Sequence, residues 1–184
     1  MRFNDHWNLK DRHAFLSPSN YHWVNDTEEK FMNRYHNYKA KERGTRLHEL
    51  AKDCIELGVK MPKNKNVFNL YVNDAIGFKM TPEQPLYYSI YCFGTADAIS
   101  FRKNTLRIHD LKTGTSPASI VQLEVYAALF CLEYGFAPSD ISIELRLYQE
   151  PDVYVHIPDP SSIREIMDTI IIFDKKLQDL SDDD

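Results

Sequence analysis

The spacing of apolar side chains predicts that the first third of the chain is largely helical. Residues 26–57 are expected to form a helix in one or two pieces, and its second half places His48, Ala51 and Ile55 on one face. Gly58 follows as a residue that commonly ends helices. Before this segment, either Ser17 or Ser19 is placed to cap a short helix that runs to Asn25.

The middle of the chain predicts a helix followed by a β-hairpin. Apolar residues recur at helical spacing from Val67 to Phe78, with Asn66 as the cap. Thr81 to Pro85 is expected to be a turn leading into the sheet. Residues 91–101 and 106–112 alternate as strands and are joined by a short polar connection, so they are expected to pair.

The last third predicts a buried helix, two strands and a final helix. Ser116 and Pro117 are expected to begin the buried helix, and Gly135 to end it. Strands are expected at 141–149 and 153–157, followed by a last helix with Asp159 as cap and Pro160 in its first turn. This order predicts an α/β fold with a mixed β-sheet flanked by helices.

The candidate chemistry centres on two charged residues of one strand. Asp110 and Lys112 are two apart and therefore share a face, whereas His109 points to the opposite face. The hairpin brings Asp97 beside Asp110, and two converging carboxylates repel each other unless a cation or a proton joins them. A divalent metal ion is therefore expected. Taken alone, an Asp-x-Lys pair on a strand is usually a solvated ion pair.

A polar stripe lies on the otherwise apolar helix after this hairpin. Gln122 and Tyr126 are four residues apart and share a face. A glutamine among apolar residues needs a hydrogen-bond partner. It either bonds a neighbouring strand for structural reasons or lies at the edge of a catalytic site.

These motifs together resemble the PD-(D/E)XK nuclease superfamily, and most closely its RecB-like exonuclease branch, which includes phage-encoded members and small CRISPR-associated nucleases. The resemblance is carried by motifs in a fixed order between about Leu16 and Tyr148: Leu16-Ser17-Pro18-Ser19, Gly44-Thr45-x-x-His48-Glu49-Leu50-Ala51, Phe93-Gly94-Thr95-Ala96-Asp97-Ala98-Ile99, His109-Asp110-Leu111-Lys112-Thr113-Gly114 and Gln122-Leu123-x-x-Tyr126-Ala127. Ala96 stands where many members have proline.

The resemblance implies a PD-(D/E)XK core, resembling that of restriction endonucleases, and a role for each motif residue. His48, Asp97, Asp110 and the backbone carbonyl of Leu111 would bind Mg²⁺ or Mn²⁺. Lys112 would orient the attacking water and stabilise charge on the phosphate. Gln122 and Tyr126 would lie near the substrate phosphate. Glu83 would match an acidic position of the family and assist.

The implied activity is metal-dependent hydrolysis of DNA phosphodiester bonds, of the exonuclease type, in DNA recombination, repair, replication or phage DNA processing. One alternative is a catalytically weak nucleic-acid-binding or assembly subunit of the same fold. Another is a metal phosphohydrolase that acts on nucleotides. No iron–sulfur cluster is expected, because such clusters are usually held by four cysteine thiolates and this chain has Cys54, Cys92 and Cys131 alone.

Length and composition are consistent with one nuclease domain over residues 1–184, with residues 1–40 as a helical N-terminal extension and 181–184 as a disordered acidic tail. No apolar run is long enough for a membrane span, so a cytoplasmic location in a prokaryotic cell or a phage-infected host is expected. The net charge of −5 predicts few phosphate contacts, aided by an oligomer or a recombination or replication partner. Basic clusters at 39–46 and 60–65 are either DNA contacts or ordinary solvated surface.

Overall fold

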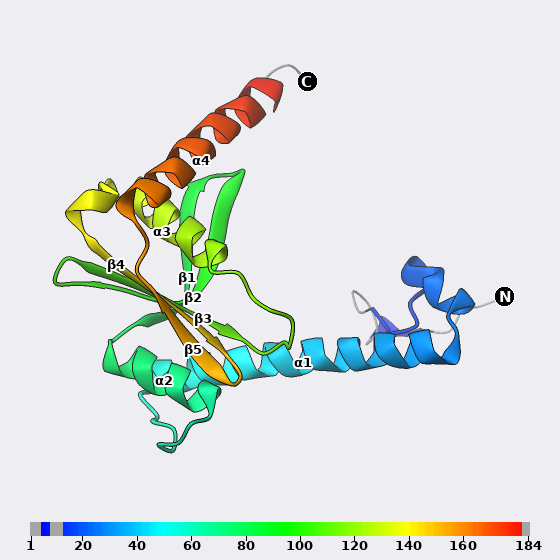
Figure 1. The fold of residues 1–184 in the computed structure, drawn as a ribbon. Helices are drawn as coiled ribbons and strands as arrows, with labels where there is room; N and C mark the ends of the chain where they lie inside the picture. Colours follow the sequence, from blue (N-terminus) through cyan, green and yellow to red (C-terminus); the bar gives the residue numbers. More distant parts are fainter. Residues whose placement is uncertain (1–4, 8–12, 182–184) are drawn as a thin grey trace. The chain divides into compact units, whose positions relative to one another are not determined.

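We describe the fold from a computed structural model that covers residues 5–7 and 13–181 (Figure 1). These residues divide into two compact units, the first ending at Thr45 and the second beginning at Arg46. The boundary falls within helix α1 (Glu28–Leu57), which is one continuous helix rather than two pieces. The predicted acidic tail lies almost entirely outside the described residues.

The first unit is held together by an aromatic cluster. The ring of Phe15 lies 5.7, 5.5 and 5.2 Å, centroid to centroid, from those of Phe31, Tyr35 and Tyr38 on α1. The predicted short helix exists as the 3₁₀ helix η2 (Pro18–Asn25). Neither serine caps it, because the hydroxyls of Ser17 and Ser19 bond each other instead.

The second unit is built on a five-stranded sheet, and the prediction of a mixed sheet flanked by helices is confirmed. Its strands lie in the order β1 (Thr81–Ser89), β2 (Cys92–Arg102), β3 (Thr105–Lys112), β4 (Ser142–Gln149) and β5 (Asp152–His156). Neighbouring strands are antiparallel except β3 and β4, which are parallel and connected through helix α3 (Val121–Tyr134).

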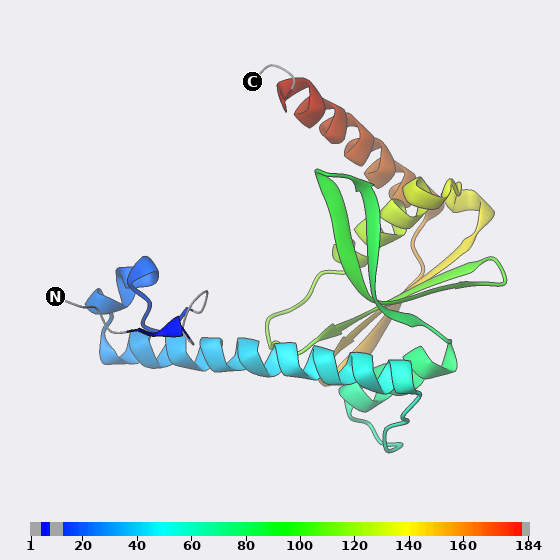
Figure 2. The same ribbon diagram turned by 180° about the vertical axis from the view of Figure 1, so that it is seen from behind.

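Helices cover both faces of this sheet (Figures 1 and 2). On one face α3 and α4 (Pro160–Ser181) bury an apolar core that includes Leu106, Ile108 and Leu145. On the other face the C-terminal part of α1, together with α2 (Val67–Gly77), buries a second core against Leu111 and Tyr148.

Several predicted boundaries are confirmed at single residues. Asn66 caps α2 by accepting a hydrogen bond of 3.1 Å from the backbone N–H of Asn69. Gly58 and Gly135 follow α1 and α3 with positive φ, the left-handed conformation that suits glycine. Asp159 accepts the backbone N–H of Ser161 at the start of α4. No helix in the described part of the chain has the length and hydropathy needed to cross a bilayer.

The predicted turn at Thr81–Pro85 is wrong, because these residues form the first half of β1. Two prolines in five residues favour a turn, since proline cannot donate a ladder hydrogen bond. β1 is the edge strand of the sheet, however, and an edge strand accommodates proline.

The predicted start of α3 at Ser116 is also wrong, because the helix begins at Val121. The side chain of Gln149, at the end of β4, holds the preceding segment in a non-helical path. Its amide group donates to the carbonyls of Gly114 and Ser116, and its oxygen accepts the N–H of Ala118. These bonds engage the backbone groups that a helical turn would need.

His109 is buried beneath α2, on the face of β3 that alternation predicts. Its ring packs edge-on against Phe78, and its Nδ1 lies 3.3 Å from the hydroxyl of Tyr148. Burial, together with the guanidinium groups of Arg146 and Arg107, lowers the pKa of His109 to about 3. The imidazole is therefore neutral in the folded protein at physiological pH.

Replacing His109 with Phe should flatten the acid dependence of stability. Below pH 6.5 the unfolded chain binds a proton at this histidine, whereas the folded chain does not until about pH 3. As the pH is lowered between these two values, the free energy of unfolding of the wild type should therefore fall by about 1.4 kcal/mol more per pH unit than that of the variant. Chemical denaturation at several pH values measures this difference. Parallel stability curves for the two proteins would contradict the assignment.

Candidate metal centre

The candidate site lies where β2 and β3 diverge. Their antiparallel ladder ends at the pair Ala98–His109, so the next residues toward the site are not paired strand to strand. In place of a backbone partner, the N–H of Leu111 donates to Oδ2 of Asp97 over 2.9 Å. The carboxylate of Asp97 thus occupies the opening of the sheet, one residue beyond the last ladder pair.

The side chains of strand β2 lose their regular alternation between the two faces of the sheet at Asp97. Ala96 packs in the core beneath α3, but Ala98 packs in the core beneath α2, although regular alternation would put both on one face. The β1–β2 ribbon bends sharply in this region (Figure 2). Across the ladder, Glu83 lies opposite Asp97, between the pairs Pro82–Ala98 and Gln84–Ala96. Glu83 has a φ of 49°, which is strained for a residue with a side chain.

This distortion brings three metal-ligand side chains together. Ligand atoms of His48 from α1, Glu83 from β1 and Asp97 from β2 all lie within 4.8 Å of one another. Nδ1 of His48 is 3.5 Å from Oδ2 of Asp97, and all three residues are partly exposed. One imidazole and two carboxylates are a donor set that suits Mn²⁺, and the carboxylates also suit Mg²⁺.

Asp110 and Lys112 form a second, adjoining group on the α3 side of the sheet. Nζ of Lys112 lies 3.0 and 2.9 Å from the two carboxylate oxygens of Asp110. The same ammonium donates to Oε1 of Gln122 on α3 over 2.8 Å. Asp110 is almost completely buried, it is paired with Lys112, and it lies outside the three-residue cluster.

The electrostatics of Asp97 link the two groups. Burial, together with the negative charge of Asp110, raises the pKa of Asp97 to about 6. His48, the N–H of Leu111 and the ammonium of Lys112 oppose this shift without cancelling it. The protein's own cations therefore leave negative charge at this position uncompensated, which is the condition under which a carboxylate pair binds a cation.

Tyr126 holds β2 against α3. Its hydroxyl donates to the carbonyl of Thr95 over 2.7 Å, and its ring lies so close to Gly94 that a Cβ there would be 3.0 Å from the ring. A Cβ there would require the ring to shift, so the close approach favours glycine. Gln122 accepts a hydrogen bond from Lys112 of β3, so it has a partner on a neighbouring strand, and its place at a catalytic site stays a prediction.

Glu83 and Tyr71 lie at or near the cluster, although the sequence does not predict either of them as a metal ligand. The sequence predicts Glu83 in a turn before the sheet, whereas it belongs to β1 and lies opposite Asp97. Tyr71 on α2 is buried near the site. Burial raises the pKa of its hydroxyl, and so do the carboxylates of Asp97, Glu83 and Asp110. The predicted strand pattern could have revealed neither residue, because β1 carries two prolines and Tyr71 simply fits the apolar face of its helix.

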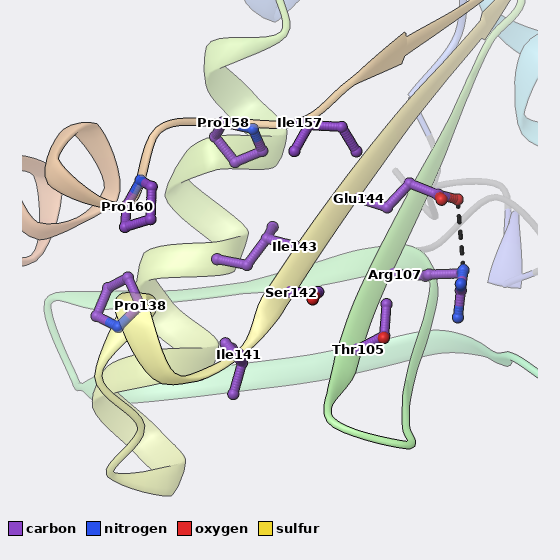
Figure 3. Close-up of a pocket in the computed structure, with 10 residues that line it drawn as sticks. All are labelled: Thr105, Arg107, Pro138, Ile141, Ser142, Ile143, Glu144, Ile157, Pro158 and Pro160. Atoms are coloured by element: carbon purple, nitrogen blue, oxygen red, sulfur yellow. Dashed lines mark ion pairs between the residues drawn. The ribbon is translucent and has the colours of Figure 1, made fainter.

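A separate cavity of about 450 Å³ lies at the opposite end of β3 and β4 (Figure 3). Its walls combine polar and apolar groups, and the ion pair between Arg107 and Glu144, with 3.4 Å between Nε and Oε1, lies along one side. The lining includes Thr105, Pro138, Ile143, Ile157 and Pro160, and no residue of the metal-ligand cluster. The cavity therefore has no part in the candidate metal centre.

No family model and no curated protein matches this chain. Among solved structures, the crystal structure of SSO0001 is similar at a TM-score of 0.32 and 12% sequence identity, over 67% of this chain and 84% of that one. A likeness of this size does not define a family.

Replacing Asp97 with Asn should stabilise the protein in the presence of a chelator. Because the folded-state pKa is raised from 3.8 to about 6, the favourable contribution of protonated Asp97 is present below pH 3.8 and is lost as the pH rises through 6. Asparagine is never charged, and its oxygen still accepts the N–H of Leu111. The variant should therefore gain up to about 3 kcal/mol at pH 7.5 and nothing near pH 3.5.

Urea denaturation with and without Mn²⁺ tests this expectation. Wild-type protein should be stabilised by Mn²⁺, while the Asp97→Asn variant should respond weakly or not at all. Asp168→Asn, an exposed change on α4, serves as the control and should leave both properties unaltered. Equal stabilisation of wild type and the Asp97→Asn variant by Mn²⁺ would rule out Asp97 as a ligand.

Proposed function

We propose that this protein is a metal-dependent deoxyribonuclease of the PD-(D/E)XK type that hydrolyses DNA phosphodiester bonds from an end. The proposal rests on one observation. At one opening of the sheet, a metal-ligand cluster lies next to the ammonium group of Lys112, which Asp110 and Gln122 hold in place. The mixed sheet with helices on both faces is compatible with such a core.

His48, Glu83 and Asp97 would hold the metal, with Asp110 completing the negative charge of the site. Mn²⁺ or Mg²⁺ bound there would supply Lewis-acid polarisation of the phosphate and a lowered pKa for water. Glu83 thereby takes a more direct role than the sequence assigned to it. Metal binding by the backbone carbonyl of Leu111 stays a prediction. The backbone N–H of Leu111 orients Asp97 by donating a hydrogen bond to its carboxylate.

Lys112 is positioned to act on the reacting phosphate. Its ammonium is fixed by Asp110 and Gln122, and its side chain retains 31% exposure, so it remains accessible to a ligand. An oriented positive charge stabilises the charge that develops on phosphate oxygens in the transition state. Gln122 positions Lys112, and Tyr126 positions β2, so both are assigned supporting roles behind the reacting groups.

Cleavage assays on labelled linear and circular DNA test the proposal. Wild-type protein should degrade linear DNA with Mn²⁺ or Mg²⁺ and be inactive with a chelator. Asp97→Ala, Asp110→Ala and Lys112→Ala should each lower the rate by at least about 10²-fold while the thermal transition is retained. Lys175→Ala, at an exposed position of α4, should cleave as wild type does.

The possible outcomes separate the parts of the proposal. Full Mn²⁺-dependent cleavage by Lys112→Ala protein would contradict the mechanism. Cleavage of circular DNA would contradict attack from an end while leaving the hydrolytic function intact. Absence of any cleavage by wild-type protein that binds Mn²⁺ would favour the nucleic-acid-binding subunit instead.

A further inference from the structure

One face of the β1–β2 hairpin is open to solvent and leads directly to the metal-ligand cluster. Starting at the tip, the cross-strand pairs on this face are Tyr87–Phe93 and Pro85–Thr95, and the next position in register is Glu83 opposite Asp97. All four residues of the first two pairs are exposed, whereas Glu83 and Asp97 are partly buried. The hairpin thus provides a continuous exposed track that ends at the candidate metal centre.

The opposite face of the hairpin is occupied by the protein itself. Leu86 is buried in the core beneath α3, and its cross-strand partner Gly94 lies against the ring of Tyr126. The exposed track is therefore not a surface that α3 or α4 covers. It is attached to α3, because the hydroxyl of Tyr126 donates to the carbonyl of Thr95 in the middle of the track.

Two aromatic rings dominate the outer end of this track. The rings of Tyr87 and Phe93 are stacked, with centroids 6.4 Å apart and an interplanar angle of 28°. Cross-strand aromatic pairs stabilise hairpins, so the pairing itself has a structural explanation. The exposure is not explained by it: Tyr87 is 51% exposed and Phe93 is 66% exposed, leaving wide π-surfaces in water.

The position of the pair relative to the metal cluster suits a nucleic-acid strand. Phe93 and Asp97 are four residues apart on one strand, which spans at most about 13 Å at roughly 3.3 Å per residue. That length corresponds to about four stacked nucleotides at roughly 3.4 Å each. A strand whose phosphate lies at Asp97 can therefore place a base a few nucleotides away on the aromatic rings.

The charge of the chain favours this mode of contact. With a net charge of −5, the protein is poorly suited to hold DNA by phosphate neutralisation alone. Stacking of bases on aromatic side chains requires no positive charge and tolerates any sequence. It does require unpaired bases, since the faces of paired bases inside a duplex are already stacked.

We propose that Tyr87 and Phe93 form a stacking platform for unpaired bases, and hence that the substrate enters the metal centre as single-stranded DNA. This inference rests on the proposed nuclease function for its choice of ligand, but binding can be measured without cleavage. The platform contacts the bases a few nucleotides from the reacting phosphate, and the track between them guides the intervening strand.

Binding of fluorescein-labelled oligothymidylate in chelator, followed by fluorescence anisotropy, tests the platform. Phe93→Ala and Tyr87→Ala should each weaken binding by about 5- to 100-fold, and Phe93→Trp should retain it. Blunt duplex of the same length should show little change. Tyr154→Ala, which removes an equally exposed tyrosine from β5, is the matched control and should bind as wild type does.

A second readout distinguishes stacking from a general loss of structure. Oligonucleotides carrying 2-aminopurine should be quenched on binding at positions near the platform, and Phe93→Ala should abolish that quenching at saturating protein. Unchanged single-strand affinity, equal losses for single strand and duplex, or a change of oligomeric state in place of affinity would each overturn the proposal. Failure of the nuclease proposal would appear separately, as absent cleavage by protein that still binds and quenches.

Discussion

The site depends on the separation of β2 from β3 at Asp97. Once the ladder ends at Ala98–His109, the N–H of Leu111 needs an acceptor, and the carboxylate of Asp97 supplies it over 2.9 Å. The same bend turns Asp97 toward Glu83, whose positive φ records the local strain. Backbone hydrogen bonding therefore explains why an acidic group lies inside the sheet opening, and packing of α1 explains why His48 reaches it.

The gathered carboxylates carry an energetic cost that the protein only partly offsets. Lys112 neutralises Asp110, and Gln122 fixes the ammonium from the other side. Asp97 keeps a raised pKa, because burial and the charge of Asp110 both disfavour its ionised form. The backbone strain at Glu83 is of the kind that proteins commonly retain at functional positions. The exposed track on the β1–β2 hairpin leads to Glu83 and Asp97, so a ligand could approach them along it.

Sequence reasoning succeeded where a short-range rule determines the structure. Alternation placed Asp110 with Lys112 and His109 opposite them, and the caps at Asn66 and Asp159 were read correctly. It failed where a distant contact decides. The prolines of β1 suggested a turn because edge position is not visible locally, and the start of α3 shifted because Gln149 holds residues 114–118 from another strand. The strand position of Glu83 was not predicted for the same reason, since Asp97, the residue opposite it in the ladder, is fourteen residues away in the sequence.

We expect a divalent cation to bind between His48, Glu83 and Asp97. Anomalous diffraction from crystals soaked in MnCl₂ can locate it. One strong manganese peak should lie in contact with Nδ1 of His48 and with carboxylate oxygens of Glu83 and Asp97, and it should be lost in a Glu83→Gln crystal soaked identically. A peak elsewhere on the molecule with none at this cluster, or no peak while the soaked crystal diffracts well, would contradict this expectation.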